Sequence, residues 1–217
     1  SHGTLDQFLL EVPDASILTK LWIFIYIADG IKSLNELGLI HTDIEPATIF
    51  IENNFFPRIG CLERCYVSEA ARGKVFTNWN NKKYKDYKEN FEMPTKIPYT
   101  PPELLNYRSE NHKGEPNVKT PVYMFGMLII NILFEMKPLP YKKESFATLL
   151  PKFKHGTAKF IFSDKEAELY GPADLFQCLR LLAFRCVNPE PSMRPTIEDC
   201  IIILRKLIRF TEQLYAY

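Results

Sequence analysis

A nearly all-apolar stretch from Tyr123 to Phe134 constrains the fold more than any other part of the sequence. It is well short of the roughly 18 to 20 apolar residues that a helix needs to cross a bilayer. Thr120 and Pro121 precede it, which is typical of a helix start with a capping residue and a proline at the first helical position. A helix that is apolar on almost every side belongs at the centre of a fold. The sequence therefore predicts a helical domain built around this segment, and no membrane span.

The composition is that of one compact folded domain. Of the 217 residues, 46% are hydrophobic and 24% are charged, which excludes a mainly disordered or low-complexity chain. Lys plus Arg number 27 and Asp plus Glu 26, so the formal charge of +1 provides no basic field for nucleic acid or anionic membrane. The 5 cysteines favour buried thiols in a reducing compartment over a disulfide framework. We expect one domain over residues 1–217 of a cytoplasmic protein, with no nucleic-acid partner.

Helical periodicity covers most of the chain. Thr4 with Gln7 three residues later is a capping-box signature for a short first helix. A second helix is predicted from about Ser16 to Leu37, with one apolar stripe and Gly38 as its stop. The same reasoning predicts helices over 122–134, 143–154, 173–185 and from 196 onward.

One part of the chain reads as β-structure. Residues 48–51 are β-branched and aromatic, Asn53 and Asn54 favour a turn, and Arg58 and Ile59 begin a second extended piece. Residues 61–102 sustain no period, so a long surface segment is expected there. The predicted fold class is mainly α with a short β-hairpin, without an internal repeat or a second domain.

Several short signatures follow one another along the chain. They are Gly3-Thr-Leu-Asp-Gln-Phe-Leu9, Ile27-Ala-Asp-Gly-Ile-Lys-Ser-Leu34, His41-Thr-Asp-Ile-Glu-Pro-Ala-Thr48, Pro57-Arg-Ile-Gly-Cys-Leu-Glu63, Tyr99-Thr-Pro-Pro-Glu103, Val122-Tyr-Met-Phe-Gly126 and Cys186-Val-Asn-Pro-Glu-Pro-Ser-Met-Arg-Pro195. In this order the chain resembles the protein kinases of the tyrosine-kinase-like branch, from the segment after the hinge to the segment before the last helix. The third signature resembles the catalytic loop H-R-D-L-x-x-x-N, and the fourth and fifth occupy the places of D-F-G and A-P-E. The resemblance implies the helical C-terminal lobe of the kinase fold.

The nucleotide-binding half of a kinase has no counterpart in this sequence. Neither a G-x-G-x-x-G loop nor a V-A-I-K lysine occurs in the chain, and these hold the phosphates in the family. We therefore expect this chain to bind no cofactor tightly. ATP and Mg²⁺ would require an intact N-terminal lobe in a longer parent protein.

At the catalytic positions implied by the resemblance, most of the residues that would bind metal ions or contact phosphate are replaced. Asp43 stands at the base position, and His41 is expected to be a packed loop residue. Phosphoryl transfer depends on metal ions and cations that neutralise the phosphates. The metal-ligand positions hold Cys61, a soft thiol that suits Mg²⁺ poorly, and Thr48, whose hydroxyl is a weak substitute ligand. Glu45 replaces a lysine that contacts phosphate in many members, and would repel it.

Other positions concern the scaffold. Glu103 and Arg194 are kept where the family forms a buried ion pair that supports the fold. Pro121 replaces an aspartate that fastens the catalytic loop to the central helix, so the loop is expected to take a non-catalytic shape. Thr42 replaces an arginine that pairs with a phosphorylated activation segment. Asp43 without metal or cation is expected to be a hydrogen-bonded loop carboxylate.

These features imply a catalytically inactive kinase-like module, a pseudokinase, that acts in signalling as a protein-binding scaffold or allosteric regulator. Two alternatives stay open. One is an active or weakly active Ser/Thr or Tyr kinase in which Asp43 serves as base with a non-standard metal arrangement. The other is nucleotide binding without transfer, which depends on an N-terminal lobe.

Protein partners are expected at two surfaces. The first is the activation segment, about 77–96, with its basic and Tyr-bearing stretch. The second is the helix predicted over 143–154, where Phe146 and Phe153 lie at helical spacing with Leu149 and Leu150. These four side chains either leave an exposed apolar patch or are all buried in the core.

Overall fold

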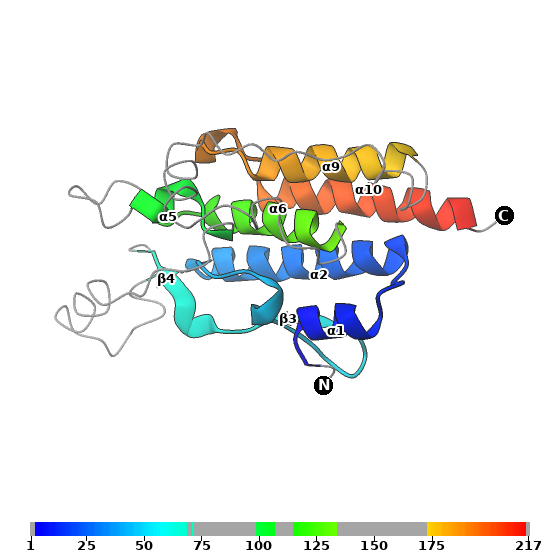
Figure 1. Cartoon of the computed structure of the whole chain (residues 1–217). Helices are drawn as coiled ribbons and strands as arrows, with labels where there is room; N and C mark the ends of the chain where they lie inside the picture. The colour runs from blue at the N-terminus through cyan, green and yellow to red at the C-terminus, as the bar shows by residue number, and fades with distance from the viewer. Residues whose placement is uncertain (1–2, 69–70, 72–98, 107–114, 134–172, 216–217) are drawn as a thin grey trace, which may run out of the picture.

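The computed structural model describes residues 3–68, 71, 99–106, 115–133 and 173–215 (Figure 1). The helices are α1 (Leu5–Glu11), α2 (Ile17–Glu36), α5 (Pro102–Asn106), α6 (Thr120–Leu133), α9 (Ala173–Cys186) and α10 (Ile197–Tyr215), with short 3₁₀ turns η1 (Pro46–Thr48), η2 (Leu62–Arg64) and η5 (Pro191–Met193). The strands are β1 (Leu39–His41), β2 (Ile49–Ile51), β3 (Pro57–Ile59) and β4 (Cys65–Val67). The two predicted docking surfaces, including Phe146 and Phe153, lie outside the described residues.

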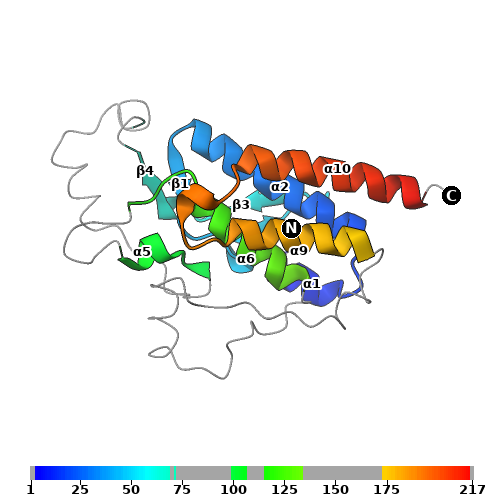
Figure 2. The same cartoon turned by 90° about the horizontal axis from the view of Figure 1, so that it is seen from above.

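The mainly α fold class is confirmed, and α6 is its central helix. Every residue of α6 is buried, as the apolar sequence of this segment predicts. In Figure 1, α6 lies between α2 and α9, and Figure 2 shows α10 running beside α2. Among the described residues, α6 packs along α9, and α10 packs along α2. No helix of the described part is both long and apolar enough to cross a bilayer.

The helix ends follow local sequence signals. Thr4 and Gln7 form the predicted capping box of α1, in which the Thr4 amide donates to the Gln7 side chain at 3.0 Å. Ser16 caps α2 by accepting from the Thr19 amide at 3.1 Å. Gly38 follows α2 with a φ of +74°, a backbone conformation that glycine adopts without strain. These predicted boundaries are therefore confirmed to within a residue.

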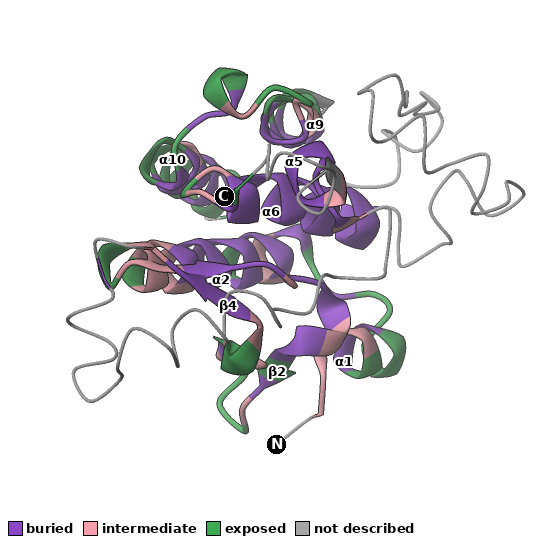
Figure 3. Cartoon of the chain, turned by 90° about the vertical axis from the view of Figure 1, so that its left-hand side faces the viewer, coloured by how far each residue is buried: buried purple, intermediate pink, exposed green. Residues whose placement is uncertain are grey.

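The buried surface of α2 is wider than the single stripe that the periodicity predicts. Ile23 points away from Leu21 and Ile25 at helical spacing, and yet all three side chains are buried. The reason is tertiary, because α10 covers one side of α2 while β1 and β3 cover another. Figure 3 shows α2 as a largely buried helix between these layers.

The predicted hairpin is confirmed, and a second strand pair corrects the sequence analysis. Strands β2 and β3 are antiparallel, with Ile49 opposite Ile59. The segment after Cys61 was predicted to be a surface segment without regular structure, but β4 lies within it and pairs with β1. Strand β4 spans only Cys65–Val67, too short to show an alternating pattern. Its partner β1 comes from a distant part of the sequence, so only tertiary structure creates this pair.

Candidate functional site

The loop between β1 and β2 carries the residues that resemble a kinase catalytic loop. It begins at His41, at the end of β1, and closes through η1 into β2. The Thr48 hydroxyl holds this turn together: it accepts from the Glu45 amide at 3.1 Å and lies 2.8 Å from the Asp43 carbonyl, to which it donates. Thr48 is buried, with 5% of its surface exposed. Its hydroxyl is thus committed to the backbone of its own loop.

His41 is a buried residue that fixes the loop to its neighbour. Nδ1 accepts from the Asp43 amide at 3.1 Å, which leaves the proton on Nε2, and Nε2 donates to the Gly60 carbonyl at 2.9 Å. Burial lowers the pKa of His41 below its usual range, and the Gly60 hydrogen bond and nearby Asp43 only partly oppose this. His41 is therefore held as a neutral ring with both nitrogens occupied.

Gly60 brings together Thr48 and Cys61, the two residues at which the resemblance implies metal ligands. Its amide donates to the Thr48 carbonyl at 2.8 Å, while its carbonyl accepts from His41. A Cβ at position 60 would lie 2.3 Å from the Phe50 ring, so only glycine lets that ring pack so closely. The peptide of Gly60 is thereby fixed on both sides, and it places Cys61 beside the loop.

Cys61 stands where the resemblance to protein kinases implies the metal-binding aspartate. Its φ of 55° is in the left-handed region, which is uncommon for a residue with a side chain. Burial raises the pKa of the Cys61 thiol, and the carboxylates of Glu63 and Asp43 raise it further. The side chain is therefore a neutral thiol rather than an anionic ligand.

Asp43 differs from the sequence expectation of a hydrogen-bonded loop carboxylate. Its backbone is held at both ends, by His41 and by Thr48. In the part of the chain that the structure describes, its carboxylate makes no hydrogen bond or ion pair, and the residue is half-buried. The reason for the difference is that the loop uses the backbone of Asp43, rather than its side chain, to close the turn.

Glu45 adds a buried negative group to the site. Only 7% of its surface is exposed, and it precedes η1 as the capping residue of that turn. Tyr99 lies within its electrostatic reach: burial raises the pKa of the Tyr99 phenol, and the Glu45 carboxylate raises it further. A lysine at this position would attract phosphate, whereas the carboxylate of Glu45 does not.

The residues at these positions do not fit the magnesium site of a kinase. Mg²⁺ takes hard oxygen ligands in a near-ideal octahedron, and a neutral thiol at Cys61 and an internally bonded hydroxyl at Thr48 do not supply them. Within the described ranges, no group of three or more His, Cys, Asp and Glu side chains is placed to hold a metal ion.

The loop is joined to the central helix by a sulfur atom. Pro121 is buried in the first turn of α6 and has no acceptor side chain. The Ile44 amide instead donates to Sδ of Met124 at 3.3 Å. Thr42 ties the other side of the loop to η2 by donating to the Arg64 carbonyl at 2.7 Å. The role of Met124 could not be predicted from the sequence, because a methionine in an apolar helix is typical of a core residue. A non-catalytic loop shape stays a prediction.

Glu103 and Arg194 form a buried bidentate ion pair. Nη1 and Nη2 of Arg194 donate to the two Glu103 carboxylate oxygens at 2.6 and 2.8 Å. Thr120, which the sequence suggests as a helix cap, donates its hydroxyl to Glu103 at 3.1 Å instead. The pair joins α5 to the segment before α10 and supports the fold.

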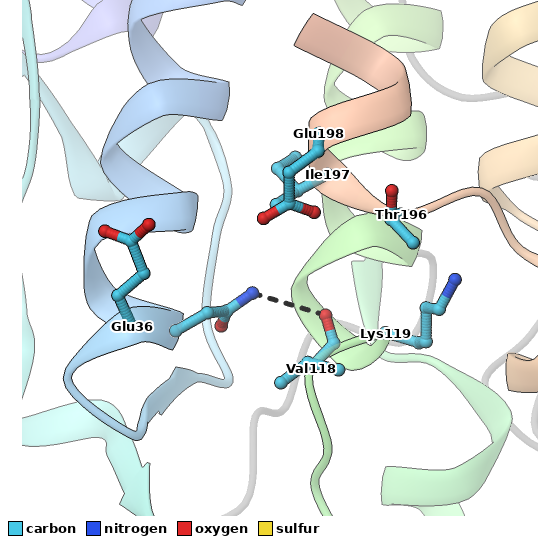
Figure 4. A pocket seen from close by; sticks show the side chains of 7 residues that line it. Glu36, Val118, Lys119, Thr196, Ile197 and Glu198 are labelled. Atoms are coloured by element: carbon cyan, nitrogen blue, oxygen red, sulfur yellow. Dashed lines mark hydrogen bonds between the residues drawn. The ribbon is translucent and has the colours of Figure 1, made fainter.

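A pocket of about 240 Å³ lies elsewhere, between the end of α2 and the start of α10 (Figure 4). Glu36 and Glu198 line it from these two helices, and Val118 and Lys119 line it from the segment before α6. It includes no residue of the loop 41–48, so it is separate from the catalytic positions.

Comparison with known proteins agrees with this arrangement of elements. The family model described as "protein tyrosine and serine/threonine kinase" matches residues 1–204. The chain belongs to the protein kinase family.

Relatives of this kinase-family chain are distant in sequence. It is 25% identical to the cysteine-rich receptor-like protein kinase 1 of Arabidopsis thaliana, over 94% of this chain and 31% of that protein. It is 24% identical to the protein kinase and PP2C-like domain-containing protein of the same plant, over 94% of this chain and 32% of that protein. It is 22% identical to the serine/threonine-protein kinase ENV7 of Saccharomyces cerevisiae, over 81% of this chain and 44% of that protein. The chain thus spans about a third of the length of the two plant relatives.

Proposed function

We propose that this kinase-family chain is a pseudokinase module that does not transfer phosphate and acts as a protein-binding scaffold or allosteric regulator. The observation that carries the proposal is the state of the two metal positions. The Thr48 hydroxyl is bonded within its own loop, and burial raises the pKa of the Cys61 thiol. Neither side chain is an oxygen ligand free to hold Mg²⁺.

The charge of the site supports the same conclusion. A carboxylate about 4 Å from a phosphate oxygen is repelled by roughly 4 kcal/mol at an effective dielectric constant near 20. Glu45 and Asp43 both lie in this loop. Without metal ions to neutralise the phosphates, the loop disfavours the transition state of phosphoryl transfer.

One observation favours a kinase with non-standard metal binding as a second candidate. The Asp43 carboxylate, at the base position, makes no hydrogen bond or ion pair with the described residues. A carboxylate in this state is able to accept a proton from a substrate hydroxyl. The experiment must therefore distinguish an idle carboxylate from a working base.

The test is phosphate incorporation by the full-length protein with labelled ATP and either Mg²⁺ or Mn²⁺, assayed on itself and on peptide libraries. We expect no incorporation above that of Asp43→Ala. Incorporation by the wild type that disappears in Asp43→Ala would establish the kinase alternative. The informative matched variant is the triple change Glu45→Lys, Thr48→Asn and Cys61→Asp, which restores the family residues at the three lost positions. Melting temperatures of all variants show whether each protein is folded.

The scaffold half of the proposal is tested separately. We propose that partners bind at the activation segment and at the segment 143–154, for which the sequence predicts a helix with Phe146 and Phe153 at helical spacing. The double change Phe146→Asp and Phe153→Asp should abolish co-purification of specific partners without lowering the melting temperature. A collapsed melting temperature would instead show that these side chains belong to the core.

A further inference from the structure

Two free cysteines lie in contact across two helices, far from each other in sequence. Cys186 is the last residue of α9, and Cys200 lies in the first turn of α10. Their sulfur atoms are 3.6 Å apart, and neither residue has exposed surface. Figures 1 and 2 both show α9 and α10 running side by side. A sulfur–sulfur bond is about 2.05 Å long, so the two sulfur atoms would have to approach each other by roughly 1.5 Å.

The chain between these cysteines carries the arginine of the buried ion pair. Arg194 lies in this segment and donates to the carbonyls of Asn188 and Pro189, which belong to it as well. The same guanidinium binds Glu103 outside the segment. A bond between Cys186 and Cys200 would thus close a loop around the whole Arg194 anchor.

The central helix also limits how this region moves. A Cβ on Gly126 of α6 would lie 2.6 Å from Cβ of Cys186, so α6 packs tightly against the end of α9. Helix α6 therefore holds Cys186 in place, while Cys200 lies against Cys186 from α10. Both sulfur atoms are positioned by helices rather than by a mobile loop.

We propose that Cys186 and Cys200 are a site of reversible oxidation, at which a peroxide forms an intramolecular disulfide that locks the Arg194 segment onto the lobe. One thiolate attacks a peroxide oxygen, which gives a sulfenic acid and releases water after proton transfer. The second sulfur then attacks the sulfenic sulfur and displaces its oxygen as a second water. The two thiols lose two electrons and two protons in total, and the peroxide is reduced to water.

Burial controls the rate of this reaction. Both thiols are inaccessible in the folded state, and burial raises the pKa of Cys186, so little thiolate is present. Oxidation therefore requires local opening of the contact between α9 and α10. The exposed Cys178 on α9 lacks this protection. We expect Cys178 to be oxidised first and the disulfide to follow more slowly.

The test uses the full-length folded protein, treated with hydrogen peroxide and then alkylated under denaturing conditions. Peptide mass analysis should show a Cys186–Cys200 linked peptide, lighter by two hydrogen atoms than its separate parts, which dithiothreitol reverses. The melting temperature should rise by roughly 5 to 10 °C on oxidation, because the bond closes a loop in the unfolded chain. Cys178→Ser is the matched control and should form the same bond, whereas Cys200→Ser should not.

Three results would overturn the proposal. Cys186 and Cys200 could both remain alkylatable after Cys178 is fully oxidised in the native protein. The linked peptide could join Cys178 to another cysteine instead. The bond could also form and leave the melting temperature unchanged or lower, which would show that it does not lock the segment. The first two results concern the wild-type protein, so they stand even if a cysteine variant fails to fold.

Discussion

Arg194 uses every hydrogen-bond donor of its side chain. Its five N–H groups reach the two oxygens of Glu103 and the carbonyls of Asn188, Pro189 and Lys119. The guanidinium also lies 5.1 Å from the centre of the Tyr123 ring. A buried charge is tolerated only when it is paired and fully hydrogen-bonded, and this one is.

Removing Arg194 should therefore be severely destabilising. Arg194→Ala leaves Glu103 as an uncompensated buried charge, which should lower the free energy of unfolding by about 3 to 5 kcal/mol in a denaturant titration. Arg209→Ala is the matched control, because Arg209 is exposed and should change the value by less than about 0.5 kcal/mol. Equal midpoints for the two variants would contradict the assigned role.

The buried His41 should make stability depend on pH. Its pKa is lowered in the folded state from an ordinary value of 6.5, so the unfolded chain binds more protons between the two values. Stability from this residue is fully present above about pH 6.5 and is lost as the pH falls toward the folded-state pKa. The urea concentration at the midpoint of unfolding should therefore decrease in the wild type as the pH is lowered below about 6.5. The decline should be shallower in His41→Gln, and identical slopes would exclude His41 as its source.

At the scale of elements, two glycines within helices distinguish the effect of packing on stability from the effect of helix propensity. A Cβ added to Gly126 of α6 would lie within 3.0 Å of two atoms, Cβ of Cys186 and the carbonyl oxygen of Ala183. Gly30 of α2 has only the Ile59 side chain that close, at the tip Cδ1 atom. Backbone and Cβ atoms cannot move aside, whereas the tip of an isoleucine can change rotamer.

The two alanine substitutions should therefore have opposite signs. Each gains about 1 kcal/mol of helix propensity over glycine. Gly126→Ala should still destabilise the protein by about 1 to 3 kcal/mol, because α9 must move away from α6. Gly30→Ala should be neutral or stabilising by up to about 1 kcal/mol. Thermal or urea unfolding of both variants measures this, and a stabilised Gly126→Ala would show that α6 and α9 are less tightly packed than the structure indicates.

The elements also show which local sequence signals suffice to predict where a helix or strand begins. The starts of α1, α2 and α10 were predicted correctly, because their caps are side-chain contacts within three residues, as between Thr196 and Asp199. Strand β4 and helix α5 were missed. Each is short, and neither carries a period that a local pattern could reveal.

On the scale of the whole molecule, the order of layers follows from how much of each helix is apolar. Helix α6 is buried on all sides, α2 on most, and α10 mainly on the side that carries Ile197, Ile201, Leu204 and Ile208. The sequence predicts the burial of α6 on all sides, because this segment is apolar on almost every side, but it predicts only one buried stripe for α2. It does not predict which neighbour covers each face.

The sequence by itself determined the helical class, the hairpin, the caps of α1, α2 and α10, and the identities of the residues at the positions that resemble catalytic ones, because these depend on local patterns and residue chemistry. Only the tertiary structure decided what those residues do. In the tertiary structure the Thr48 hydroxyl bonds to the backbone of its own loop, and the Asp43 carboxylate has no partner among the described residues. The loop also contacts the sulfur atom of Met124. The tertiary structure also set Cys186 against Cys200. The Met124 contact and the contact between the two cysteines join residues through the packing of separate elements. No local pattern encodes the distance between two side chains on different helices.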